Sequence, residues 1–138
     1  MVTQNGKIFR DFISWSTQSG TTDDIHIKTN IRKGSGTMFR FLIEGYNYQA
    51  GTPINSEAVG YTFNQDNCLV YTSTIDHAPN VTTSLYCSSD DYVVIRLDVR
   101  PTLYFVGLSV SVWFVNPNNP LDPSTPPGYE IRHLGGSF

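Results

Sequence analysis

The sequence predicts an all-β protein: a single antiparallel β-sandwich or jelly-roll-like domain with a proline-rich C-terminal arm. Short segments alternate apolar and polar residues, most clearly between Ile25 and Phe63, and this period of two is typical of half-buried strands and not of helices. Clusters of Gly, Pro, Asn, Asp and Ser separate these segments at intervals of about 8 to 12 residues, as in sandwiches and barrels. After Val115 the composition changes, because five of the eight prolines lie between Pro117 and Pro127.

Three strands are predicted in the first part of the chain, over residues 7–15, 25–31 and 37–48. Asp11 interrupts the apolar face of the first strand, and Gly45 is expected to form a bulge in the third. Alternate side chains of a strand point to opposite faces, so each strand has one face directed into the core. The residues expected to face the core are Phe9, Ile13, Trp15, Ile25, Ile27, Ile31, Phe39, Phe41 and Ile43.

Six further strands are predicted in the remainder of the chain. They cover residues 54–63, 68–75, 81–87, 92–100, 102–115 and the short final segment 128–134. The two strands before the proline-rich segment have the most regular alternation. Their core-facing residues are expected to be Val93, Ile95, Leu97, Val99, Tyr104, Val106, Leu108, Val110, Val112 and Phe114.

The chain is expected to divide into an N-terminal strand and linker at residues 1–24, a β-sandwich core at residues 25–115, and an extended arm at residues 116–138. Proline lacks the amide hydrogen that a sheet ladder uses and favours the polyproline conformation. We therefore expect the arm to dock onto a neighbouring subunit. Its docking residues are expected to be Pro117, Pro120, Pro123, Pro126, Pro127 and Tyr129.

Length and composition indicate one domain with few surface charges. The chain has 138 residues and a mass of 15.4 kDa. Charged residues make up 15% of it, against an average of about 25%, and aromatic residues 13%, which suits an interface with protein or sugar. The net charge of −3 indicates no partner among nucleic acids. No segment is apolar over the roughly 18 residues of a membrane span, and no export signal is visible.

No motif indicates catalysis or the binding of a cofactor or a metal, so we expect a non-enzymatic protein without cofactors. A catalytic serine needs an activating base and often a G-x-S-x-G elbow, whereas the serines here lie in ordinary turns. The densest set of metal-ligand types, Asp23, Asp24 and His26, matches neither a calcium loop nor an H-x-x-x-H spacing. A glycosidase is the weakest alternative. Its two catalytic carboxylates are recognised by their separation in space, which a sequence does not give.

Cys68 and Cys87 both fall in predicted strands, with 18 residues between them. A disulfide between them would stabilise the fold by about 3 kcal/mol in the chain-entropy model. The alternative is a pair of small buried thiols, and this alternative is favoured for a protein assembled in a cytosol.

Two sets of residues are candidates for contacts with a subunit or a receptor. Arg40 and Glu44 on one predicted strand, and Arg96, Asp98 and Arg100 on another, place charges on polar strand faces. These charges are expected either to pair across a sheet face or to face solvent. The chain also has more aromatic residues than one small core accommodates, and exposed aromatics favour contacts with sugar rings or subunits. The aromatic candidates for such contacts are Tyr46, Tyr48 and Trp113.

Five segments between residues 25 and 115 are distinctive, and they read HIKTNI, MFRFLIEGYNY, INSEAVGYTF, YVVIRLD and LYFVGLSVSVWF. Together they resemble a β-rich domain of tailed bacteriophages, especially aquatic and cyanobacterial ones, that occurs in tail-fibre and virion structural proteins. The resemblance implies a non-enzymatic protein of the virion surface that is assembled in the host cytoplasm as a homotrimer. It also implies contacts with other tail or capsid proteins, and with a glycan or protein of the host surface.

A tail fibre ordinarily has an N-terminal anchor and shaft before its receptor-binding tip, whereas about 24 residues precede the predicted sandwich here. The chain is therefore expected to be either an excised tip or a short complete protein. The leading expectation is a trimeric tail-fibre-like appendage or receptor-recognition domain. The alternative is a capsid decoration (cement) protein, which stabilises the head through docked terminal arms that add buried area.

Overall fold

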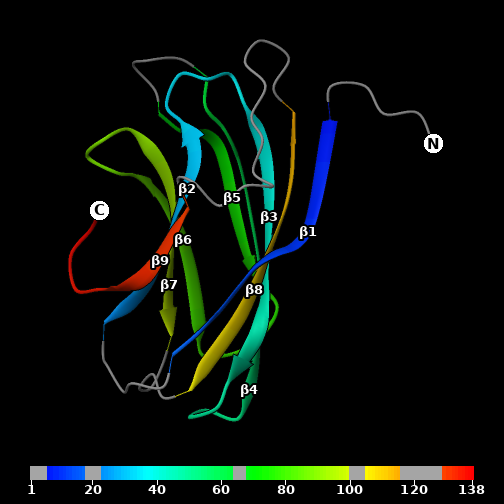
Figure 1. Ribbon diagram of the computed structural model, residues 1–138, viewed down its shortest axis with the longest axis vertical. Coiled ribbons are helices and arrows are strands. Elements are labelled where there is room, and N and C mark those ends of the chain that lie inside the picture. The colour runs from blue at the N-terminus through cyan, green and yellow to red at the C-terminus, as the bar shows by residue number, and fades with distance from the viewer. Residues whose placement is uncertain (1–5, 18–22, 64–67, 100–104, 116–128) are drawn as a thin grey trace.

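In the part of the chain that the structure describes, nine strands form two antiparallel sheets that pack face to face (Figure 1). This computed structural model describes residues 6–17, 23–63, 68–99, 105–115 and 129–138, and these residues contain no helix. The all-β prediction is therefore confirmed, and the architecture is that of a β-sandwich.

The two sheets differ in size. The larger sheet has the strand order β1 (Gly6–Ser16), β8 (Val106–Val115), β3 (Met38–Asn47), β4 (Thr52–Tyr61) and β5 (Val70–Asp76). The smaller sheet has the order β6 (Val81–Cys87), β7 (Tyr92–Val99), β2 (Asp24–Arg32) and β9 (Glu130–Leu134). The edge strands are therefore β1 and β5 in the larger sheet, and β6 and β9 in the smaller one.

The nine strands correspond to the nine predicted segments. The sandwich extends past residues 25–115 in both directions, because β1 pairs with β8 and β9 pairs with β2. Several predictions lie outside the described residues: those for Arg100, Tyr104, Pro117, Pro120, Pro123, Pro126 and Pro127.

Alternation along the strands directs one face of each sheet into a shared core. The described core-facing residues predicted for β2, β3, β7 and β8 are all buried, and Phe41, Ile43 and Ile95 are completely so. Burying one such side chain stabilises the fold by roughly 1.5–3 kcal/mol. On the edge strand β1, Phe9 and Ile13 pack against this core and are partly buried. Packing between the two inner faces therefore holds the sheets together.

A β-bulge explains why Asp11 interrupts the apolar face of β1. Phe9 pairs with Val112 and Ile13 with Val110, so the ladder shifts between Phe9 and Ile13. Asp11 has a φ of 47°, a left-handed conformation that aspartate tolerates better than most residues. Its amide donates to Ser111 Oγ at 2.8 Å. The bulge thus directs Asp11 away from the core and keeps apolar residues on both sides of it in register.

Gly45 does not form the bulge that the sequence predicts. It lies in a regular ladder, opposite Ile54 on β4 and Leu108 on β8. A Cβ atom at this position would lie 2.0 Å from the carbonyl oxygen of Gly107 on β8. The glycine therefore allows a close approach of two backbones, which is the other common reason for a glycine inside a strand.

Two links join the sheets at opposite ends of β5 and β6. Cys68, just before β5, forms a disulfide with Cys87 at the end of β6, and their Cα atoms are 6.5 Å apart. The favoured expectation of two free thiols therefore differs from the structure. Asp76, at the end of β5, accepts hydrogen bonds from Ser56 Oγ at 2.6 Å and from the amide of Thr83 on β6 at 3.0 Å. These links fix the edge of one sheet against the edge of the other.

Candidate functional site

The exposed large apolar side chains of the described residues gather on one sheet. We call the side of the five-stranded sheet that points away from the core the outer face. All nine of these side chains lie on the outer face, on the bulged edge of β5, or within two residues of the ends of its strands. They are Ile8, Met38, Tyr46, Tyr48, Phe63, Tyr71, Ile75, Phe105 and Trp113. The outer face is therefore the candidate interaction surface.

Strand register places the residues of the outer face in rows. In one row Ile8, Trp113, Arg40 and Val59 are neighbours on four successive strands. In the next row Ser111, Leu42, Glu57 and Ile75 are neighbours in the same way. Further along the strands the row becomes polar, with Ser109, Glu44 and Asn55. The next row contains Tyr46 and Pro53, so the outer face has apolar side chains towards both ends and polar and charged groups between them.

A short chain of charged side chains crosses the middle of the outer face. Arg40 Nε donates to Glu57 Oε1 at 3.0 Å, and Arg40 Nη2 donates to the same oxygen. The other carboxylate oxygen of Glu57 accepts a hydrogen bond from His77 Nε2. The hydrogen bonds from Arg40 and then His77 lower the pKa of Glu57 below its usual value. Glu57 therefore stays ionised and holds the guanidinium of Arg40 in place.

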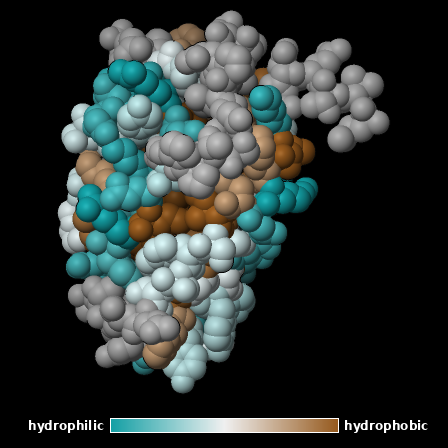
Figure 2. All heavy atoms as spheres, in the orientation of Figure 1, coloured by the Kyte–Doolittle hydropathy of each residue, from teal (hydrophilic) through white to brown (hydrophobic). Residues whose placement is uncertain are grey.

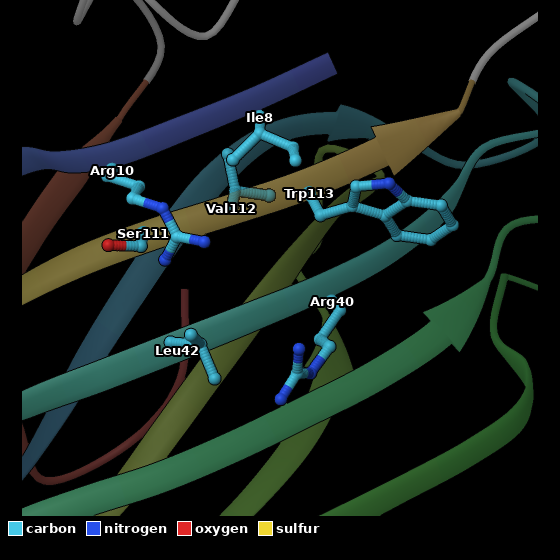
Figure 3. A pocket seen from close by; sticks show the side chains of 7 residues that line it. All are labelled: Ile8, Arg10, Arg40, Leu42, Ser111, Val112 and Trp113. Carbon is cyan, nitrogen blue, oxygen red and sulfur yellow. The ribbon is translucent and has the colours of Figure 1, made fainter. Parts of the chain in front are cut away.

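Next to Arg40 the outer face contains a small hollow of about 100 Å³ (Figure 3). Its lining includes the side chains of Ile8, Arg10, Arg40, Leu42, Ser111 and Trp113, which come from β1, β8 and β3. Two arginines, an indole ring and a hydroxyl group therefore surround an apolar floor. Such a set can hold an anionic group and, beside it, a flat apolar one.

The structure divides the predicted contact residues between the two sheets. Arg40, Glu44, Tyr46 and Trp113 lie on the outer face. Tyr48 follows β3, and its ring meets that of Phe105 edge-on at 5.5 Å. Tyr129, predicted to dock on a neighbouring subunit, instead meets Phe12 of its own chain edge-on at 5.2 Å.

Of the two alternatives for these charges, pairing across a sheet face does not occur between β3 and β7, because the two strands belong to different sheets. Arg96 Nε instead donates to Asp24 on β2 at 2.6 Å, and Asp98 lies beside Thr82 on the smaller sheet. Sequence reasoning did not find Glu57 as the partner of Arg40. The signal for it is the hairpin register, which places Glu57 opposite Leu42 and diagonal to Arg40.

The far side of the smaller sheet is covered by the C-terminal residue. The amide of Phe138 donates to the Tyr86 hydroxyl at 2.9 Å, and that hydroxyl lies 2.7 Å from Nδ1 of His26. The guanidinium of Arg132 lies 4.6 Å from the centre of the Phe138 ring. His26, an outward-facing residue of β2, is consequently completely buried.

This burial predicts a dependence of stability on pH. Burial, with a smaller contribution from the charge of Arg96, lowers the pKa of His26 below its usual value of 6.5, although Asp24 opposes the shift. The unfolded chain therefore binds a proton more readily than the folded one. We expect the free energy of unfolding to fall as the pH drops from about 6.5 towards 5.

Urea unfolding at pH 7.5, 6.5, 5.5 and 5.0 measures this dependence. The variant His26→Gln keeps a polar side chain of similar size but does not titrate, so its stability should change less over the same range. Equal pH dependence in the two proteins would show that His26 is not responsible.

A second opening lies between the edge strands β1 and β9. Figure 2 shows hydrophobic residues gathered on this side of the molecule. The opening has a volume of about 300 Å³, and its lining includes Phe12, Trp15, Tyr129 and Ile131. The Tyr129 hydroxyl is buried there without a hydrogen-bond partner among the described residues, and burial raises its pKa. The ring of His133 meets that of Trp15 at 5.4 Å.

In the described part of the chain, no three His, Cys, Asp or Glu side chains are grouped so that they could hold a metal ion. Those same residues include no helix of the length and apolarity that a membrane crossing requires. Comparisons with protein-family models, with curated proteins and with solved structures find no match to this chain.

Proposed function

We propose that the chain is a non-enzymatic structural protein of a tailed-phage virion, a trimeric appendage or receptor-recognition domain that acts by surface complementarity. One observation carries the proposal: every exposed large apolar side chain among the described residues belongs to the five-stranded sheet or its ends. The likeness of the strand segments to phage β-rich domains supplies the virion context.

The residue types on the outer face support a role in recognition. Aromatic residues, Met and Arg are enriched at the centres of protein interfaces, and Trp113, Tyr46, Met38 and Arg40 bring all three kinds together on one sheet. The ladder also fixes the backbone from which these side chains project, so little backbone ordering is needed when a partner binds. The same surface serves either a neighbouring subunit of the trimer or a receptor.

The number of copies in purified particles tests the proposal against its alternative. A few to tens of copies per virion supports an appendage, whereas hundreds of copies supports a capsid decoration protein. Absence of the chain from purified particles would contradict both. Light scattering of the purified protein gives the subunit number, and a stable monomer would contradict the trimer.

Replacing Trp113 with alanine tests the outer face directly. We expect attachment to particles or host cells to weaken by about tenfold or more, because exposed tryptophans are frequent hot spots. The free energy of unfolding should change by less than about 1 kcal/mol, since the side chain is 38% exposed. Binding and light scattering, measured together, separate loss of the receptor from loss of the trimer.

The matched control is Tyr92→Ala. Tyr92 is a partly exposed aromatic residue at the start of β7, on the smaller sheet and away from the outer face. It should retain attachment. Full attachment by Trp113→Ala would show that the contact surface lies elsewhere.

A further inference from the structure

The hollow beside Arg40 contains a positive charge that the described residues leave unpaired. The side chain of Arg10 forms no ion pair or hydrogen bond with them, although it lines the hollow (Figure 3). It immediately precedes Asp11, whose bulge shifts the register of β1 against β8. Arg10 follows Ile8 on the outward side of β1 and lines the hollow together with Ser111 of the neighbouring strand.

Arg40 is the second cationic group of the hollow, and Glu57 orients it. Glu57 binds Nε and Nη2 of Arg40. The Arg40 side chain therefore loses little conformational freedom when a ligand binds. Glu57 also offsets one of the two positive charges. The hollow is therefore suited to one carboxylate group, bound chiefly by Arg10, and not to a highly charged anion.

Polar groups next to the arginines can bind hydroxyl groups. Ser111 lines the hollow, and on its far side Ser109 Oγ donates to Asp11 Oδ1 at 2.9 Å. The Asp11 carboxylate accepts hydrogen bonds, and the serine hydroxyls both donate and accept them. Sugar hydroxyl groups can pair with both kinds of group. A neutral apolar ligand would gain no hydrogen bond from these groups.

Trp113 provides a flat apolar surface at the opposite side of the hollow. Its indole is partly exposed, and Ile8 and Leu42 lie beside it. The C–H face of a pyranose ring packs well on such an aromatic surface. A carboxylate, ring hydroxyls and an apolar ring face occur together in uronic acids and related acidic sugars.

We propose that this hollow binds one carboxylate-bearing sugar residue of an acidic glycan, with Arg10 on the carboxylate, Ser111 on a hydroxyl group and Trp113 against the ring. This inference rests on the proposed role in recognition and names the ligand class of that surface. An acidic peptide fits less well. The hollow lies over the faces of β1, β8 and β3, so a peptide that paired with the free edge of β1 would lie beside the hollow and not in it.

Titration with a short oligogalacturonate, and with the corresponding neutral galactose oligomer, tests the proposal. We expect the acidic oligomer to bind at least about tenfold more tightly than the neutral one, and more weakly as salt is added. Arg10→Gln should weaken acidic binding by about tenfold and leave the weak binding of the neutral oligomer unchanged. Trp113→Ala should weaken the binding of both.

Arg32→Gln is the matched control, because Arg32 is an exposed residue of the smaller sheet and the change in net charge is the same. It should bind like the unmodified protein. Equal binding of acidic and neutral oligomers, an equal effect of the Arg10 and Arg32 variants, or tighter binding of a polyglutamate peptide would each overturn the proposal. If the oligomers fail to bind while Trp113→Ala still abolishes attachment, the ligand class is wrong and the recognition role stands. If Trp113→Ala leaves attachment intact, the recognition role itself fails.

Discussion

Replacing Gly45 with alanine is expected to lower the free energy of unfolding by about 3 kcal/mol or more, an amount that can prevent folding. The new Cβ would lie 2.0 Å from the carbonyl oxygen of Gly107 and 2.7 Å from the Cα atom of Leu108. Both are backbone atoms of β8, a strand paired on both sides, so they cannot move away as the end of a flexible side chain would. Urea unfolding measures the loss.

The control for this substitution lies on the neighbouring strand. A Cβ at Gly107 would meet no atom closer than 3.9 Å. Gly107→Ala should therefore change stability by less than about 1 kcal/mol, and the smaller flexibility of alanine in the unfolded chain favours the folded state. If the two substitutions cost the same, the close approach at Gly45 is not what that glycine provides.

Reducing the disulfide between Cys68 and Cys87 is expected to cost about 3 kcal/mol of stability. The bond closes a loop with a sequence separation of 19 and connects the edge strands of the two sheets. Its loss frees the unfolded chain and also removes a link between β5 and β6. Urea unfolding with and without a reducing agent measures the effect.

A variant with both cysteines replaced by alanine provides the comparison. It should resemble the reduced protein in stability and should not respond to the reducing agent. Unfolding of the unmodified protein at the same urea concentration under both conditions would show that the bond is absent or adds no stability. Asp76 offers a second link at the other end of these strands, through Ser56 and Thr83, so the reduced protein should still fold.

The strands and the inner face of the sandwich were predictable because alternation is a local property. Ile25, Ile27 and Phe41 show their orientation through their immediate neighbours in the sequence. The partition of strands between the sheets is not local. Arg40 and Arg96 occur in similar patterns, yet one lies on the larger sheet and the other on the smaller, and only the long-range pairing of β3 with β8 and of β2 with β7 separates them.

The candidate site was predictable only in part, for the same reason. Trp113 and Arg40 fall on the outward positions of their strands, so their exposure follows from alternation. Arg10 shares the outward side of β1 with Ile8 by the same alternation, but only the long-range pairing of β1 with β8 brings it to Trp113 and Arg40. The covering of His26 by Phe138 involves two residues far apart in the sequence and had no local signal.

The strand order also has a consequence for the rate of folding. Phe9 on β1 pairs with Val112, and Ile27 on β2 pairs with Ile131, so each sheet includes an edge that joins residues more than one hundred positions apart. Chains dominated by such distant contacts fold slowly, over roughly milliseconds to seconds, because loop closure precedes the gain from pairing. On the ribosome, the β3–β4 hairpin can form early, whereas the smaller sheet waits for β9, which is synthesised about one hundred residues after β2. Until then β2 exposes an unpaired edge, and the nascent protein is most prone to aggregate in that interval.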